Sequence, residues 1–289
     1  MGQALKLRAG TPADAEAEAC GMICYEAFRA VCTSHGFPPD FPSPQAAAST
    51  MAMVLGHPRV FSVIAEVDGR IAGSNFMDER SVVRGIGPIT VDPAIQNTGI
   101  GRQLMKAAID RAAESKSVGV RLLQAGFHNR SLSLYTSLGF VTREPISILQ
   151  GKPLGFSLPG HIVRSATLDD VVACNALCFR VHGFDRGGEV TDAIGQGAAL
   201  VVEHLGRITG YTTGLAFGAH SVGETNRDVM ALLGAATEFG GPGVLIPTRN
   251  HELFAWCLSR GLRVVYQMHL MTIGLYNEPA GAWLPSILY

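Results

Sequence analysis

Three stretches in the first half of this chain recur, in the same order, in its second half. The first reads Arg-x-x-Thr-x-x-Asp, the second is hairpin-like and ends in Gly-Arg-Ile-x-Gly, and the third places Asn six residues before an aromatic residue. The matched pairs are 8–14 with 164–170, 64–73 with 201–210, and 129–139 with 250–261. Ordered self-similarity of this kind predicts a duplicated structural unit, so we expect both halves to share one fold.

The alternation of strand-like and helix-like segments in the first half is typical of an α/β protein in the broad, α+β sense. The expected strands are 5–8, 60–67, 70–78, 83–91, 118–126 and 140–149, and the expected helices are 14–32, 44–55, 99–115 and 131–137. Residues 150–160 are rich in Gly and Pro and predict a linker. A chain of 289 residues is long enough for two domains, which we place at 1–152 and 160–289.

The composition argues against several classes of function. Hydrophobic residues make up 47% of the chain and charged residues 16%, and the net charge is -1, so we expect no nucleic-acid partner. No apolar run reaches the roughly 20 residues that span a bilayer, and the N-terminus lacks the apolar core of a signal peptide. The six cysteines form no CxxC pair and no zinc-type cluster with His, so we expect no metal. A cytoplasmic protein with reduced thiols fits this pattern.

The segment most informative for function runs from Ile89 to Arg102. It reads as an apolar strand, a turn, the sequence Gln96-Asn-Thr-Gly99-Ile-Gly101, and then a helix. Glycines let the backbone approach a ligand closely, and the unpaired amides and dipole of a helix N-terminus attract an anion. The spacing is neither that of a Walker A loop nor that of a dinucleotide fingerprint. The segment therefore predicts a phosphate-binding loop of another kind.

A second motif lies downstream, where Asn129 is followed by Tyr135 and then by Gly139 and Phe140. In order and spacing, the two motifs together resemble the signature of the GNAT family (GCN5-related N-acetyltransferases), which is Gln/Arg-x-x-Gly-x-Gly/Ala, then Asn, then Tyr-x-x-x-Gly-Phe. The resemblance covers the first half fully and the second half weakly. It implies a tandem arrangement of two GNAT-like domains, each with a mixed, splayed central sheet flanked by helices.

The resemblance also implies acetyl-CoA (CoA) as cosubstrate, bound where the sheet splays, with no metal. By analogy, the backbone of 89–91 pairs with the pantetheine arm and the amides of 96–102 hold the pyrophosphate. Asn129 binds the cofactor arm, and Tyr135 protonates the leaving thiolate. The implied cofactor-binding residues are Ile89, Thr90, Val91, Gln96, Asn97, Thr98, Gly99, Ile100, Gly101, Arg102, Asn129 and Tyr135.

Several of these residues also have a structural interpretation. Tyr135 could be a packing residue on a helix face, and Asn129 could be a helix N-cap. For the general base we select Glu79, which lies with Asp78 at the end of a predicted strand, where related enzymes often carry an acidic residue. The same pair also reads as a solvated turn. His128 is a weaker candidate for the base.

The second half departs from the motif. It lacks the glycine loop, and Glu224 and Asp228 place negative charge where phosphates would lie. Trp256 replaces the tyrosine and is bulky enough to fill the space of a pantetheine arm. We therefore predict that this half binds no CoA, and its role stays open between covering the acceptor cleft, binding another ligand and forming a homodimer. The apolar tail 279–289 is expected to pack across the domains.

The leading functional hypothesis is an N-acetyltransferase that moves an acetyl or other acyl group from acetyl-CoA to a primary amine of a small molecule or peptide. The amine attacks directly in a ternary complex. Phe28 and the Pro-rich loop 35–44 are expected to shape the acceptor pocket, by analogy with the family. The alternative is a non-catalytic acyl-CoA or metabolite sensor, and the presence of Tyr135 favours the enzyme.

Overall fold

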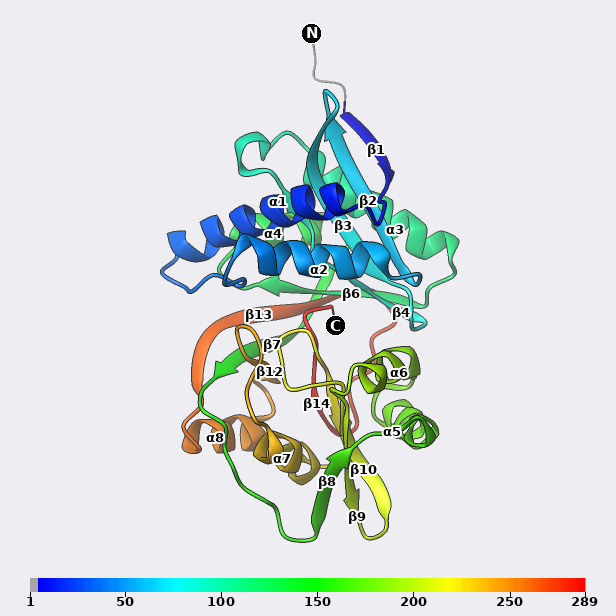
Figure 1. The fold of residues 1–289 in the computed structure, drawn as a ribbon, viewed down its shortest axis with the longest axis vertical. Coiled ribbons are helices and arrows are strands. Elements are labelled where there is room, and N and C mark those ends of the chain that lie inside the picture. Colours follow the sequence, from blue (N-terminus) through cyan, green and yellow to red (C-terminus); the bar gives the residue numbers. More distant parts are fainter. Residues whose placement is uncertain (1–4, 289) are drawn as a thin grey trace.

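The chain folds into two β-sheets that are covered by helices (Figure 1). The computed structural model describes residues 5–288, within which nine strands form one mixed sheet and five form an antiparallel second sheet. The strands are β1 (Leu5–Ala9), β2 (Val60–Val67), β3 (Arg70–Asp78), β4 (Val83–Ile86), β5 (Thr90–Val91), β6 (Gly119–Ala125), β7 (Val141–Gln150), β8 (His161–Ser165), β9 (Leu200–His204), β10 (Arg207–Thr212), β11 (Ser221–Gly223), β12 (Val244–Pro247), β13 (Arg263–Gly274) and β14 (Ala282–Leu284). The helices are α1 (Asp14–Ser34), α2 (Pro44–Gly56), α3 (Ile100–Glu114), α4 (Asn129–Ser137), α5 (Val171–His182), α6 (Gly187–Gly195), α7 (Asn226–Ala235) and α8 (His251–Ser259), with short 3₁₀ turns η1 (Pro93–Ile95) and η2 (Leu168–Asp170).

The elements predicted for the first half are confirmed apart from one strand, and the α/β class is confirmed with them. Helix α2 begins where the sequence places it, because Ser43 caps it by accepting a hydrogen bond from the Ala46 amide at 3.2 Å and Pro44 follows at the first helical position. Helices α1 and α2 cross closely, since a Cβ on Gly21 would lie 2.4 Å from the Ala48 Cα. Both helices lie across one face of the large sheet in Figure 1. The six cysteines are free and buried, as expected of small apolar residues.

The prediction of a single strand at 83–91 is wrong, because Gly87 and Pro88 separate two shorter strands, β4 and β5. Proline has no amide hydrogen to give to a sheet, so pairing is interrupted here. Strand β4 pairs in parallel with β6 up to Gly85 opposite Arg121, whereas β5 pairs with β3 alone. Beyond Gly85 the large sheet is therefore splayed between β5 and β6.

Strand β13, from the second half of the chain, lies in the middle of the large sheet. It pairs with β6 on one side and with β7 on the other, and β7 pairs in turn with β12. Residues 151–160 contain no helix or strand, in agreement with the predicted linker. The pairing of strands nevertheless crosses this linker, so the two halves share one sheet. The division at 152 and 160 remains a prediction about units of sequence.

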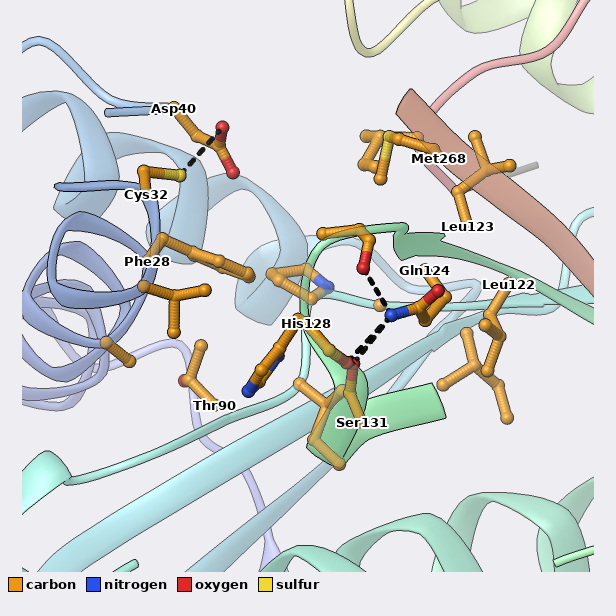
Figure 2. A pocket seen from close by; sticks show the side chains of 18 of the residues that line it. Phe28, Cys32, Asp40, Thr90, Leu122, Leu123, Gln124, His128, Ser131 and Met268 are labelled. Carbon is orange, nitrogen blue, oxygen red and sulfur yellow. Dashed lines mark hydrogen bonds between the residues drawn. The ribbon is translucent and has the colours of Figure 1, made fainter. Parts of the chain in front are cut away.

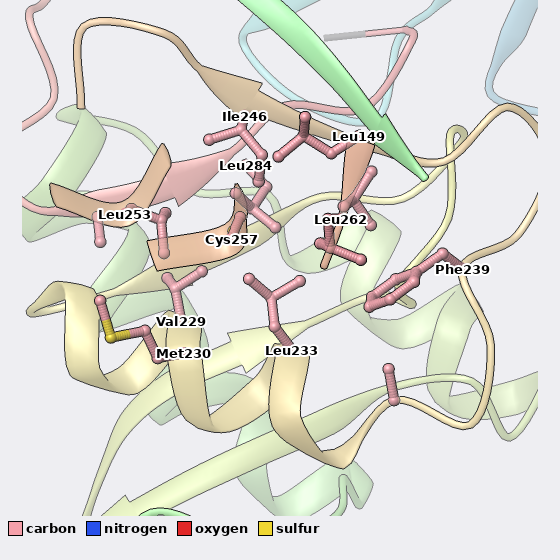
Figure 3. Close-up of a cluster of buried hydrophobic side chains, with 13 residues drawn as sticks. Leu149, Val229, Met230, Leu233, Phe239, Ile246, Leu253, Cys257, Leu262 and Leu284 are labelled. Carbon is pink, nitrogen blue, oxygen red and sulfur yellow. The ribbon is translucent and has the colours of Figure 1, made fainter. Parts of the chain in front are cut away.

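The exchange of strands also builds the core of the second half. Leu149 of β7 is buried in the same cluster as Val229 of α7, Leu253 of α8 and Leu284 of β14 (Figure 3). A side chain from the first half of the chain thus completes a core whose helices come from the second. Among residues 5–288, no helix is both long and apolar enough to cross a membrane.

The C-terminal tail connects the two halves, as predicted from its apolar sequence. Ala282, Trp283 and Leu284 are buried, and they form β14 against β11. Further on, the tail reaches the first half, where the Leu288 carbonyl oxygen would lie 1.7 Å from a Cβ on Gly85. Only a glycine therefore fits at position 85.

We expect Gly85→Ala to destabilise the protein and displace the tail, because the new methyl group meets a backbone carbonyl that cannot rotate away. Overpacking of this kind costs about 1–3 kcal/mol. Circular dichroism melting and limited proteolysis of the tail measure the effect. Gly56→Ala is the matched control, since nothing lies within 4 Å of a Cβ there. Equal melting temperatures for the two variants would contradict the close contact.

Candidate active site

A cavity of about 730 Å³ occupies the region where the large sheet splays. Its walls include β5, the loop that follows it and the N-terminus of α3 on one side, and β6 and the start of α4 on the other. The cavity is also lined by residues of α1, α2, β13 and the C-terminal tail, and by the loops at 40–42, 216–218 and 240–242. Both halves of the chain therefore contribute to one cavity, part of which is shown in Figure 2.

Strand β5 presents an open edge to this cavity. One edge of Thr90–Val91 pairs with Gly73 and Ser74 of β3, and no strand pairs with the other edge within residues 5–288. The Thr90 hydroxyl is buried and has no hydrogen-bond partner among the described residues. Ile89, which precedes the strand, also lines the cavity. An extended ligand with amide groups could pair with this edge as an added strand would.

The loop after β5 has the geometry of an anion site. Asn97 and Gly99 have φ values of 69° and 90°, a left-handed conformation that Gly and Asn adopt most readily. Gln96 ties the loop to β5, because its Nε2 donates to the Val91 carbonyl at 3.0 Å. The first amides of α3 have no partners within the helix, and they face the cavity together with the positive end of the helix dipole. All the residues from 96 to 102 line the cavity, as the sequence predicts.

Two arginines flank the loop. Arg130, on α4, donates to the Asn97 side chain at 2.9 Å and also to the Gln96 side chain. Arg102 donates to the Ser137 hydroxyl at 2.8 Å. Arg130 was not predicted from the sequence, although its place beside Asn129, in a motif linked to the cofactor, was a usable signal. Two cations beside unpaired amides favour a diphosphate over a neutral ligand.

Helix α4 carries Tyr135 into the cavity wall. Gln124 of β6 fixes the start of α4, because its Nε2 donates to the His128 carbonyl and to the Ser131 hydroxyl, each at 3.0 Å (Figure 2). The Tyr135 ring is 8% exposed and packs 6.1 Å from the Phe140 ring. Burial raises the pKa of Tyr135 well above its usual value, so the phenol stays protonated and can act as a donor. The packing role and the donor role are thus compatible.

Two predicted site residues do not reach this cavity. Asn129 is exposed at the first turn of α4 and lines a shallow neighbouring groove. Glu79 lies outside the described lining and forms an ion pair with Arg111 at 2.8 Å. Asp78 is likewise paired with Arg80, at 2.6 Å. The structure therefore does not bring the expected base to the other site residues.

His128 does line the cavity, but burial, together with the nearby Arg130, lowers its pKa. An acidic residue that the sequence analysis did not single out lies there instead. Asp40, in the Pro-rich loop, lines the cavity and accepts a hydrogen bond from the Tyr266 hydroxyl of β13. Nothing in the sequence pairs these two residues, which are 226 positions apart. Among residues 5–288, no group of three or more His, Cys, Asp or Glu residues has the arrangement of a metal site.

Comparison with known proteins identifies the part of the chain that supplies most of the residues lining this cavity. The family model described as an acetyltransferase (GNAT) domain matches residues 23–152. Residues 23–152 are a GNAT acetyltransferase domain. A search of curated proteins found no match.

Solved structures resemble the GNAT domain and the second half together. A candidate acetyltransferase from Pyrococcus horikoshii superposes with a TM-score of 0.75 at 17% identity, over 98% of this chain and 95% of the other. A GCN5-related N-acetyltransferase from Sphaerobacter thermophilus gives 0.61 at 15% identity, over 94% and 96%. A tandem GNAT protein from the clavulanic acid biosynthesis pathway gives 0.58 at 13% identity, over 94% and 98%. At these identities the likeness concerns the fold, which is therefore of the tandem GNAT kind along nearly the whole chain.

The counterpart of the anion site in the second half is occupied by the chain's own groups. Asp228 is buried at the start of α7, where its carboxylate accepts from the Thr225 amide at 2.9 Å and from the Thr225 hydroxyl at 2.7 Å. Glu224 is paired with Arg180 and Arg207. The predicted negative charge is thus present, and it forms a capping box with Thr225 at the helix N-terminus.

The cleft beside that helix is filled as well. Strand β14 pairs with β11 along the edge that corresponds to the open edge of β5 in the GNAT domain. Trp256 packs instead against Phe156 of the linker, with ring centroids 5.6 Å apart. The sequence analysis assigned the filling of this space to Trp256, and the structure assigns it to β14.

We expect titration of the whole protein with CoA to saturate at one equivalent. The GNAT domain offers an open strand edge beside the amides of α3, whereas in the second half β14 covers the corresponding edge and a capping box holds the start of α7. Isothermal titration calorimetry measures the stoichiometry. Gly101→Val, which alters only the first site, should weaken this single binding event at least about 100-fold. A second equivalent that survives this substitution would show that the second half binds the ligand independently.

Proposed function

We propose that this protein transfers an acetyl group from acetyl-CoA to the nitrogen of a primary amine. The observation that carries the proposal is the meeting, in one cavity, of an open strand edge, the amides at the start of α3 and the protonated Tyr135. The residues present fit the cosubstrate. The unpartnered Thr90 hydroxyl and the open edge of β5 suit an amide-containing arm, and Arg102 and Arg130 suit a diphosphate.

In this proposal each group has one task. The α3 amides and the two arginines bind the diphosphate, and the backbone of β5 aligns the arm so that the thioester lies beside Tyr135. An amide of β5 could also donate to the thioester oxygen as it gains charge, an effect worth about 10²–10³ in rate in other enzymes. The amine nitrogen forms a bond to the thioester carbon, and the carbon–sulfur bond breaks. Tyr135 donates to the departing sulfur, which leaves as the free thiol.

An assay for free thiol, run with acetyl-CoA and a panel of primary amines, tests the proposal. We expect amine-dependent thiol release, with N-acetylated product detected by mass spectrometry. Binding of CoA without release of thiol for any amine would support the sensor alternative. Failure to bind CoA at all would remove both.

A further inference from the structure

We infer that the acceptor is an apolar primary amine without a carboxylate, that its ammonium group binds Asp40, and that Tyr266 holds Asp40 in place. This inference rests on the proposed function and specifies its substrate class. It also gives the second half of the chain a part in recognising the acceptor.

The cavity that Asp40 lines is largely apolar outside the phosphate loop. Apolar and aromatic side chains dominate that part of the lining, and they come from α1, the Pro-rich loop, β6 and the residues after it, β13 and the tail. They include Phe28, Phe41, Leu123, Phe127, Met268 and Ile287. Such a wall binds an alkyl or aromatic group by excluding water, and aromatic faces also attract a cation.

The Asp40 carboxylate is only partly engaged by hydrogen bonds. Oδ1 accepts from the Tyr266 hydroxyl at 2.5 Å and from the Cys32 thiol at 3.8 Å (Figure 2 shows the Cys32 contact). Oδ2 accepts no hydrogen bond from any of residues 5–288. Asp40 forms no ion pair with any described residue, although it borders a largely apolar cavity. A carboxylate in such a place is costly without a cation, and an incoming ammonium group supplies one.

The part of the cavity wall that the structure describes has no free cationic side chain to pair with a carboxylate on the acceptor. Among the described lining residues there is no lysine, and the arginines are Arg102 and Arg130, which bond to Ser137 and to the phosphate loop. An amino acid would bring its own carboxylate close to Asp40 with no positive partner for it. Like charges in a poorly solvated site repel each other, so such an acceptor is disfavoured.

Asp40 can also accept a proton that the amine must lose before it reacts. Alkylamines enter mostly as ammonium ions at neutral pH, and only the neutral nitrogen can attack. One ammonium proton passes to the Asp40 carboxylate and later to solvent. The nitrogen loses a second proton to solvent when the new carbon–nitrogen bond forms. The departing sulfur gains one proton from Tyr135, which is reprotonated from solvent, so one proton is released overall.

Burial raises the pKa of Asp40, and the hydrogen bond from Tyr266 opposes that rise. The other titratable groups near it are the thiols of Cys24 and Cys32, whose pKa values are raised by burial, and His128 on the same cavity wall, whose pKa is lowered. These groups are neutral near pH 7, so among them the negative charge at neutral pH lies on Asp40. We therefore expect the acid limb of kcat/KM to report the ionisation of Asp40.

A matched pair of acceptors tests the substrate class. We expect 2-phenylethylamine and hexylamine to be acetylated, and phenylalanine, which is 2-phenylethylamine with an added carboxylate, to be at least about 100-fold poorer in kcat/KM. Efficient acetylation of phenylalanine would overturn the inference and leave the proposed function standing. Acetylation confined to peptides would do the same.

Variants test the two residues. Asp40→Asn should lower kcat/KM for the amine by about 10²–10⁴, while the Kd for CoA stays within about threefold. The matched control is Asp110→Asn, on an exposed face of α3 outside the described lining. An unchanged kcat/KM in a folded Asp40→Asn protein would overturn the inference.

Tyr266 is a positioning residue, and the pH dependence of kcat/KM in a variant tests this role. Tyr266→Phe keeps the ring contacts with Phe37 and Phe127 but removes the hydrogen bond that favours the charged form of Asp40. The pKa of Asp40 therefore rises, and the acid limb of kcat/KM should move to higher pH. A lower rate with an unmoved limb would show that Tyr266 acts only through packing, which contradicts the assigned role.

A direct binding measurement distinguishes failure of the proposed function from failure of the inference about the acceptor. Calorimetry with 2-phenylethylamine and the CoA-bound protein needs no turnover, and Asp40→Asn should weaken this binding at least about tenfold. If the amine binds in this manner and no thiol is released with acetyl-CoA, the proposed function fails while the recognition site stands. If thiol is released with other acceptors and this amine does not bind, only the further inference fails.

Discussion

Tyr135→Phe should lower kcat by about 10²–10⁴, the usual contribution of general acid–base catalysis. The substitution removes one hydroxyl and keeps the ring that packs against Phe140. Within residues 5–288 the hydroxyl has no hydrogen-bond partner, so no internal bond is lost and the fold should be retained. Because burial raises the pKa of the phenol, Tyr135 is expected to act as a donor through the neutral range. Steady-state thiol release measures kcat, and calorimetry measures CoA affinity.

The two measurements distinguish a catalytic role of the Tyr135 hydroxyl from a role in binding CoA. A fall in kcat with unchanged CoA affinity supports donation to the leaving sulfur. Equal losses in both would indicate that the hydroxyl shapes the binding site, and no loss of kcat would remove Tyr135 from the mechanism. Tyr25→Phe is the matched control, because Tyr25 lies on α1 and outside the described lining.

Gly101→Val should weaken CoA binding at least about 100-fold, equivalent to about 2.7 kcal/mol. A Cβ at this position would lie 3.7 Å from Val91 and 3.8 Å from Leu134, so one methyl group fits in ordinary contact. The two further methyl groups of valine project into the lining at the start of α3, where the amides are expected to meet phosphate. Calorimetry with CoA measures the loss.

A graded series makes this result specific. Gly101→Ala should bind nearly as well as the wild type, since its single methyl group has space. Gly195→Val, at the end of α6 with nothing within 4 Å of a Cβ, controls for the general cost of valine in a helix. Unchanged affinity in folded Gly101→Val protein would show that the anion lies elsewhere.

The sequence alone was enough to predict the anion site, the place of Tyr135 and the duplication of the fold. A strand, a glycine loop and a helix N-terminus are contiguous in 89–102, so backbone rules are enough to predict an anion site there. Tyr135 was identified through its spacing from Asn129 and Gly139. The duplicated stretches predicted one fold for both halves, and the tandem structural relatives agree with this.

The tertiary structure decided which charged groups meet in the cavity. Glu79 was selected because it is near the cofactor strand in sequence, yet Arg111 holds it outside the lining. Asp40 and Tyr266 meet only because β13 crosses from the second half into the large sheet, and no local pattern encodes a contact over 226 positions. Likewise, the loss of an anion site in the second half could be predicted from Asp228. That β14 fills the neighbouring cleft could not be predicted, because it depends on the path of the C-terminal tail through the structure. Local sequence specifies elements and caps through neighbouring residues, whereas strand exchange depends on the packing of the whole chain.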